Sequence, residues 1–154
     1  MEPTIVPAAE LTTLIGKQME PGDWFQITQE NINKFADVTV DHQFIHIDPE
    51  AAKASPFGGT IAHGFLTLSM LSHLVESCSV MPAEVVMGIN YGFDKVRFLT
   101  PVHAGKRIRV SVTIADVTPK DGNRYLLKQA VTIEIEGSDS PAAVCEWLTM
   151  FVCG

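Results

Sequence analysis

The sequence predicts an α+β domain in which a long antiparallel sheet surrounds one buried helix. Residues 65–77, FLTLSMLSHLVES, are apolar over most of a helical circumference, and their polar side chains fall on one narrow stripe. The second half of the chain alternates apolar and polar residues over long stretches, as half-buried antiparallel strands do. Because such a helix avoids water on nearly every side, the strands are expected to wrap around it.

Length and charge restrict the class of protein. The 154 residues suffice for one domain with a real core, and we expect residues 1–154 to form a single domain. The net charge is −7, from 18 acidic and 11 basic residues. Binding to nucleic acid or to an anionic membrane needs a basic surface, so neither partner is expected. A small anionic ligand needs only a few local cations or amides and remains compatible with this charge.

The cysteines and the hydropathy pattern indicate a cytoplasmic protein. Cys78, Cys145 and Cys153 are odd in number and lack the spacing of metal ligands. The chain shows no secretory leader pattern and no run of about 18 apolar residues, so we expect no membrane span.

The N-terminal half contains three short expected elements. WFQI (24–27) is a strand candidate, whereas residues 1–23 are interrupted by Pro and Gly and indicate no element. Thr28 can cap a helix that continues to about Val38. Asp48-Pro49 starts a short helix, EAAKA, with Asp as the cap and Pro in the first turn. The buried side of the first helix is expected to carry Ile32, Phe35 and Ala36, with Val38 as a further candidate.

The remaining segments are connectors and strands. DHQFIHI (41–47) is expected as a loop, and SPFGGTIAHG (55–64) as a Gly-rich connector. TPVHAGK and TPKDGN are expected turns. The expected strands are residues 84–98, 106–118, 124–136 and 142–153.

The stretch DHQFIH (41–46) concentrates groups that can do chemistry. His42 and His46 are four residues apart and would share a helical face, as two zinc ligands do. However, the apolar residues around them break a helical pattern, and Pro49 disfavours helix at the residue before it. No third ligand lies at a recognisable spacing, so no metal is expected.

Asp41 and His46 allow a second interpretation. Five residues correspond to about 140° around a helix, so these side chains converge only where the backbone curls between them. A carboxyl with a pKa near 4 and an imidazole with a pKa near 6.5 can hold one water between them and act as base and acid. The alternative is an Asp that caps local backbone and a His that is solvated in a turn. The spacing alone leaves both interpretations open.

The surrounding motifs resemble one family. DHQFIHIDPEAA followed by PFGGTIAHGFLTLSML is similar to the signature of the MaoC-like (R)-specific enoyl-CoA hydratases, and the similarity extends to VRFLTPVHAGKRIRV. The short members related to nodulation protein N and to polyester-monomer-supplying hydratases are the most similar. One departure is that Gln43 and Phe44 occupy two positions of the family pattern D-x-N-P-x-H.

The resemblance implies a fold and a reaction. The fold is the hot-dog fold, a long antiparallel sheet wrapped around a central helix. The reaction is hydration of trans-2-enoyl-CoA to (R)-3-hydroxyacyl-CoA, without a cofactor. The expected partners are the acyl-CoA substrate and a second copy of the chain, in a homodimer or a higher homo-oligomer.

The resemblance also assigns roles to residues. Asp41 and His46 would hold and polarise the water. Gly64 opens the central helix, where backbone N–H groups are unpaired, and would donate to the thioester oxygen. Ser72 matches a serine near the catalytic Asp, although it also belongs to the polar stripe of the helix. His63 would brace the turn through a hydroxyl or carbonyl partner.

Two alternatives remain at this point. One keeps the fold and changes the reaction to that of an acyl-CoA thioesterase or an acyl-ACP dehydratase, because fold alone does not determine function. A hot-dog thioesterase usually carries a carboxylate on or near the central helix, and Glu76 is the only acid in that helix. The other is a non-catalytic acyl-CoA-binding or signalling module.

Overall fold

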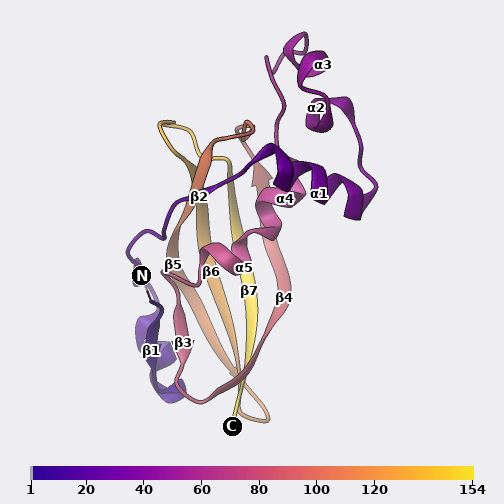
Figure 1. Cartoon of the computed structure of the whole chain (residues 1–154). Helices are drawn as coiled ribbons and strands as arrows, with labels where there is room; N and C mark the ends of the chain where they lie inside the picture. The colour runs from indigo at the N-terminus through magenta and orange to yellow at the C-terminus, as the bar shows by residue number, and fades with distance from the viewer. Residues whose placement is uncertain (1) are drawn as a thin grey trace.

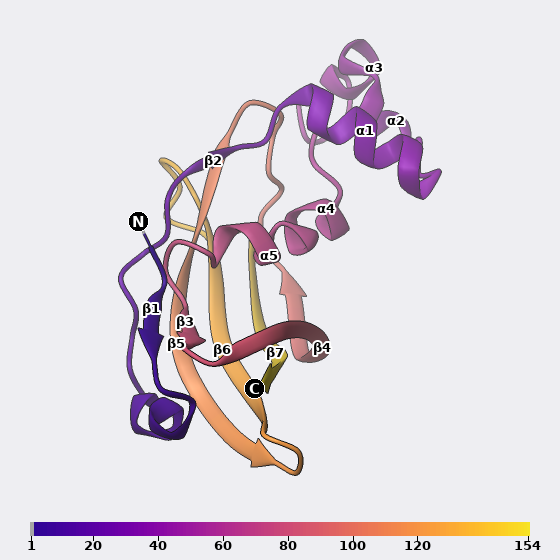
Figure 2. The same ribbon diagram turned by 60° about the horizontal axis from the view of Figure 1, so that its bottom comes forward.

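A curled five-stranded antiparallel sheet forms the body of the protein. The computed structural model describes residues 2–154, and the strand order is β2-β5-β6-β7-β4. Two short helices, α4 and α5, lie against the concave face of this sheet (Figures 1 and 2). The predicted α+β architecture is therefore confirmed. The strands are β2 (Phe25–Gln26), β4 (Val85–Phe98), β5 (Arg107–Lys120), β6 (Arg124–Ile135) and β7 (Ala143–Cys153).

The long strands follow the predicted ranges closely, with one difference at the β5–β6 turn. TPKDGN was expected to be a turn throughout, but β5 continues to Lys120. The turn itself contains Gly122 and Asn123 at φ 73° and 54°, conformations suited to a tight hairpin. Pro119 lies within β5 beyond the short β2, where one side of the strand is unpaired and a missing N–H costs little.

The central helix is present but interrupted. The predicted helix over residues 65–77 is divided into α4 (Gly64–Ser69) and α5 (Leu71–Leu74), with Met70 between them. The Ser69 hydroxyl donates back to the carbonyl of Phe65 at 2.6 Å, a bond that commonly bends helices. The buried side chains of this segment, Leu66, Leu71 and Leu74, pack in the same core cluster as the inward residues of β5, β6 and β7.

The N-terminal region contains elements that the sequence did not indicate. β1 (Thr4–Val6) pairs in parallel with β3 (Val80–Pro82), and a 3-10 helix spans Ala8–Leu14. These elements are stabilised by distant partners rather than by a local periodic pattern. Among residues 2–154, no helix combines the length and apolar character needed to cross a membrane.

Three helices form an arm that stands away from the sheet (Figures 1 and 2). They are α1 (Gln29–Thr39), α2 (Phe44–Ile47) and α3 (Pro49–Lys53). We call residues 29–61, which include these helices and the following connector, the overhang. Thr28 caps α1 and Asp48 caps α3, both as predicted. The prediction of a loop over residues 41–47 was wrong in part, because residues 44–47 form one helical turn.

The buried side of α1 differs from the prediction near the C-terminal end of the helix. Ile32 and Ala36 are buried, whereas the side chain of Val38 is 84% exposed. Val38 therefore does not belong to the buried side that the pattern suggested. The helix ends at Val40, whose backbone has φ 61° and ψ 22°, in the left-handed region. This conformation is unusual for a β-branched residue.

Replacing Val40 with Asn is expected to stabilise the protein. A left-handed conformation costs an L-residue roughly 1–2 kcal/mol, and Asn tolerates it better than Val. Val40 is 78% exposed, so little burial is lost. Thermal denaturation of Val40→Asn should show a midpoint about 2–4 °C above that of the wild type. The control is Val38→Asn, an exposed helical site without strain, and an equal shift in both variants would contradict the explanation.

Candidate functional site

His46 is held inside the overhang with a defined ring orientation. The α2 turn buries its side chain to 7% exposure, and its Nδ1 lies 2.7 Å from the carbonyl oxygen of Ile61. A carbonyl only accepts hydrogen bonds, so Nδ1 carries the proton of this bond. In the neutral ring, Nε2 is then the atom with a free lone pair. His46 is thereby arranged to accept a proton at Nε2.

His63 lies directly against His46. It immediately precedes α4, is 3% exposed, and its ring stacks on that of His46 with centroids 3.8 Å apart and planes inclined by 23°. Its Nε2 donates to the main-chain carbonyl of Asp41 at 3.0 Å. His63 thus connects the start of the central helix to both ends of the DHQFIH stretch. Its Nδ1 is buried and has no partner among the described residues.

The carboxylate of Asp41 faces the two histidines from the solvent side. The side chain is 54% exposed, and its Oδ2 lies 3.9 Å from His63 Nε2. Asp41, His46 and His63 each contribute one nitrogen or oxygen to a group of atoms within 4.8 Å of one another. One water can bridge two groups separated by up to about 5.5 Å, twice a normal hydrogen bond. The Asp41 carboxylate and a ring nitrogen of His46 are therefore close enough to share a single water.

The same cluster is poorly arranged for a metal ion. Nitrogen lone pairs lie in the plane of each ring, and these two planes are nearly parallel. An ion about 2.0–2.1 Å from one nitrogen, in the plane of its ring, would lie well off the plane of the other. In addition, one nitrogen of each ring is already directed at a carbonyl. The cluster is therefore better suited to water than to zinc.

An apolar cavity of about 250 Å³ adjoins this cluster. Ile61, whose carbonyl binds His46, and Gly64, which follows His63, both belong to its wall. The N–H of Gly64 donates to no other group among residues 2–154. The lining residues are Phe57, Ile61, Ala62, Gly64, Thr67, Phe98, Leu99, Thr100, Pro101, Val102 and Ala142.

A side chain at Gly64 would crowd the ring of Phe98. A Cβ at this position would lie 3.1 Å from atoms of that ring, a contact tighter than usual. The sequence analysis placed Gly64 at the start of a long central helix, as a donor to the thioester oxygen. Because α4 has only six residues, the dipole is smaller than a full central helix would provide. The feature that still supports a donor role for Gly64 is its unpaired N–H beside the cavity.

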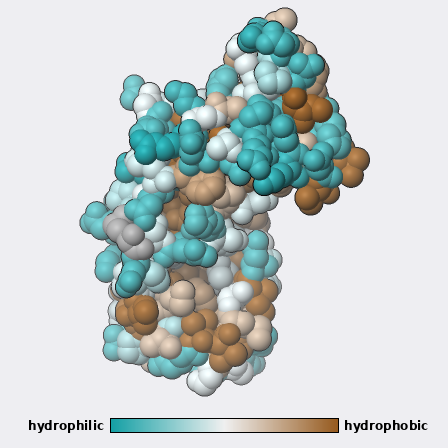
Figure 3. Space-filling view, in the orientation of Figure 1, coloured by the Kyte–Doolittle hydropathy of each residue, from teal (hydrophilic) through white to brown (hydrophobic). Residues whose placement is uncertain are grey.

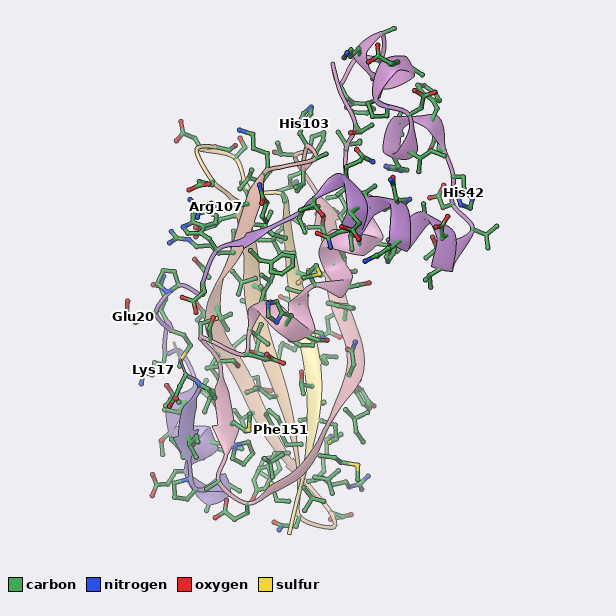
Figure 4. All side chains as sticks on the ribbon, viewed as in Figure 1. Lys17, Glu20, His42, His103, Arg107 and Phe151 are labelled. Carbon is green, nitrogen blue, oxygen red and sulfur yellow. The ribbon has the colours of Figure 1, made fainter. Side chains whose placement is uncertain are left out.

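The other residues singled out in the sequence lie elsewhere. Ser72 lines a separate cavity of about 90 Å³ together with Asn90 and Trp147, and it does not belong to the wall that contains Gly64. His42 lies on the outer side of the overhang (Figure 4), where its Nε2 is 2.8 Å from Asp37 Oδ1. The structure thus brings together Asp41, His46, His63 and Gly64, but not Ser72 or His42.

Sequence reasoning missed one group of contacts at this site. The side chain of Gln29 bonds to the main chain of His46 and to Thr60. The sequence predicted a helix that starts after Thr28, and Gln29 is its first residue, but the pattern assigned Gln29 no role. No periodicity or motif marks it, because its partners are 17 and 31 residues away in the chain.

Comparison with known proteins places this arrangement in a family. The pattern of the MaoC-like domain matches residues 10–136. The chain belongs to the MaoC-like dehydratase family. Nodulation protein N of Rhizobium meliloti is 44% identical over 148 residues, which is 94% of this chain and 91% of that protein. The 3-hydroxyacyl-thioester dehydratase Z of Mycobacterium tuberculosis is 42% identical over 149 residues, 97% of this chain and 98% of that protein.

A solved structure supports the fold of this MaoC-like protein. The (R)-hydratase PhaJ1 of Pseudomonas aeruginosa superposes with a TM-score of 0.72 at 23% identity, over 97% of this chain and 87% of that one. The predicted hot-dog fold is thereby confirmed, as is the predicted similarity to nodulation protein N.

Proposed function

We propose that this MaoC-like protein hydrates trans-2-enoyl-CoA to (R)-3-hydroxyacyl-CoA and catalyses the reverse dehydration. The observation that carries the proposal is the orientation of His46. Its Nδ1 is committed to the Ile61 carbonyl, which leaves Nε2 with the free lone pair, and its ring belongs to the same cluster as the Asp41 carboxylate. The cavity that starts at Ile61 and Gly64 offers an apolar space for the acyl chain. The name of the mycobacterial relative supports an acyl-thioester substrate.

In the proposed mechanism, one water supplies all the atoms that are added. Asp41 and His46 Nε2 each accept a hydrogen bond from one of the two O–H groups of this water. The water oxygen attacks Cβ, the π electrons move to Cα, and negative charge develops on the thioester oxygen. His46 takes the proton from the water and delivers it to Cα. Acid–base catalysis of this kind contributes roughly 10²–10⁴ in rate.

The N–H of Gly64 is the proposed donor to the thioester oxygen. It is unpaired and lies in the cavity wall next to the residue that stacks on His46. A donor of this kind contributes about 2.7–4 kcal/mol where the charge develops in the transition state. The remaining cavity wall would then contact the acyl chain.

The thioesterase alternative finds less support in the structure. Glu76 is exposed and lies 3.6 Å from His73 Nδ1, beyond the end of α5. It is absent from the cavity that contains Gly64. A thiol nucleophile is also disfavoured, because burial raises the pKa of Cys78 and of Cys145 to about 11 and keeps both protonated at neutral pH.

An assay with crotonyl-CoA as the substrate distinguishes these functions in one experiment. Loss of the enoyl-thioester absorbance with formation of 3-hydroxybutyryl-CoA is the expected result. Release of free CoA, detected with a thiol reagent, would instead indicate a thioesterase. Binding without either reaction would support the non-catalytic module and would refute the proposal.

We further propose that the protein is a homodimer joined through β4. β4 lies at one edge of the five-stranded sheet, and one of its sides pairs with β7 while no strand pairs with the other among residues 2–154. A long unpaired apolar edge favours association. Brown, hydrophobic surface gathers on the lower part of the face in Figure 3, and also on the overhang. The exposed apolar side chains of β4 include Val86, Met87, Ile89, Tyr91 and Phe98.

The mass in solution tests the dimer. Light scattering at micromolar concentration should give twice the chain mass of 16.8 kDa. Ile89→Lys should shift the protein toward the monomer, because it places a charge in the proposed interface. Ala115→Lys, at an exposed position of β5 away from the β4 edge, is the control. A fully active monomer would contradict the proposal.

A further inference from the structure

The carboxamide of Gln29 connects three separate parts of the site. Gln29 is the first residue of α1. Its Nε2 donates to the main-chain carbonyl of His46 at 2.7 Å and to Asn33 Oδ1 at 2.9 Å. Its Oε1 accepts a hydrogen bond from the hydroxyl of Thr60, which is itself buried. Both hydrogens and the oxygen of the amide are therefore used.

These bonds occur where the backbone turn that carries His46 has few other restraints. α2 contains only four residues and has no side-chain cap. Besides Gln29, the turn is joined to the connector by two bonds with Ile61. Ile61 accepts from His46 Nδ1 at 2.7 Å, and its N–H donates to the carbonyl of Ile45 at 3.0 Å. Thr60 and Ile61 are consecutive, so the Gln29 side chain closes a ring of contacts around the His46 backbone.

We propose that Gln29 is a positioning residue for the catalytic histidine. It holds the α2 turn against the connector, and so sets the distance between His46 Nε2 and the water-holding carboxylate of Asp41. It does not contact the water or the substrate itself. The inference rests on the proposed hydratase function, because the position of Nε2 matters only if this atom moves a proton.

The expected effect is on turnover rather than on binding. A displacement of about 1 Å in a catalytic group can reduce the rate by 10². The cavity that would hold the acyl chain does not include Gln29. Gln29→Ala should therefore lower kcat by about tenfold to a hundredfold and change KM little. Far-UV circular dichroism and the melting midpoint would show that the variant is folded.

Asn33→Ala is the matched control. Asn33 is exposed, lies one turn further along α1, and accepts from the same Nε2 of Gln29. Its loss leaves the bonds from Gln29 to His46 and Thr60 in place, so kcat should remain close to that of the wild type. Equal losses in Gln29→Ala and Asn33→Ala would indicate only general damage to α1 and would overturn the inference.

Gln29→Glu allows a measurement of pH dependence in kcat that a merely structural role of Gln29 would not produce. A protonated carboxyl can donate to the His46 carbonyl and accept from Thr60, as the amide does, whereas a carboxylate cannot donate. The kcat of this variant, divided by that of the wild type at the same pH, should rise as the pH falls from about 8 toward 5. The ratio removes the pH dependence that the wild type and the variant share. A ratio that is independent of pH would contradict positioning through this hydrogen bond.

A measurement without substrate separates this inference from the proposed function. The ring-proton NMR signals of His46, assigned by their loss in His46→Gln, should shift in Gln29→Ala and stay in place in Asn33→Ala. If the wild type fails to hydrate any enoyl-CoA, the proposed function fails, while the shift of these signals still decides whether Gln29 positions His46. If the wild type is active and neither kcat nor these signals respond to Gln29→Ala, the inference about Gln29 alone is wrong.

Discussion

Asp41→Asn and His46→Gln are each expected to reduce kcat by roughly 10²–10⁴-fold in the hydration of crotonyl-CoA. Asp41→Asn keeps the shape of an exposed side chain and leaves its main-chain bond from His63 untouched. In His46→Gln, the amide can still donate to the Ile61 carbonyl, but its carbonyl oxygen is a poor proton acceptor. Both variants should remain folded, so the losses would report on the reaction.

His46→Ala is a less suitable variant than His46→Gln. The structure buries His46 against the ring of His63. Truncation would leave the Ile61 carbonyl without its donor and expose one face of the His63 ring. Leaving a buried acceptor unpaired costs about 1–3 kcal/mol, so part of the effect would be a loss of stability.

Two comparisons test whether Asp41 and His46 act as a unit. The double variant should be little slower than the slower single variant, because either loss leaves the water without one partner. His42→Ala, which only removes the surface contact to Asp37, should retain nearly full activity. Near-normal turnover in Asp41→Asn or in His46→Gln would show that the assigned pair does not carry the reaction.

The second prediction is that all of the product is the (R) isomer. If the Gly64 N–H holds the thioester oxygen, the plane of the conjugated enoyl group is fixed. His63 connects Gly64 to the Asp41 and His46 groups, so the water approaches from one side. The hydroxyl and the Cα proton should then be added to the same face. The family resemblance implies that this face leads to the (R) product.

Coupled assays measure this stereochemistry directly. Hydration of crotonyl-CoA is coupled in parallel to an (R)-specific and to an (S)-specific 3-hydroxyacyl-CoA dehydrogenase, each with NAD. NADH formation with the (R)-specific enzyme alone is expected. Hydration in deuterated water should also place deuterium and hydroxyl on the same face. NADH formation with the (S)-specific enzyme alone would refute the proposed substrate geometry.

The sequence by itself determined the elements whose signals are local. Thr28 and Asp48-Pro49 mark helix starts, because a cap involves only residues within one turn. The alternating strands were recognisable because burial on one face of a sheet repeats every second residue. Asp41 and His46 were identified as a candidate pair from their residue types and the surrounding motifs.

Only the tertiary structure decided how the candidate site is assembled. The stacking of His63 on His46, and the bonds from Gln29 to His46 and Thr60, join segments 17 to 31 residues apart. The same holds for the parallel pair β1–β3 and for the exposure of Val38, which follows from the overhang standing away from the sheet. A short polar contact between distant segments produces no periodic pattern in the sequence. Its partners are determined by the packing of the whole chain and not by the residues adjacent to them in sequence.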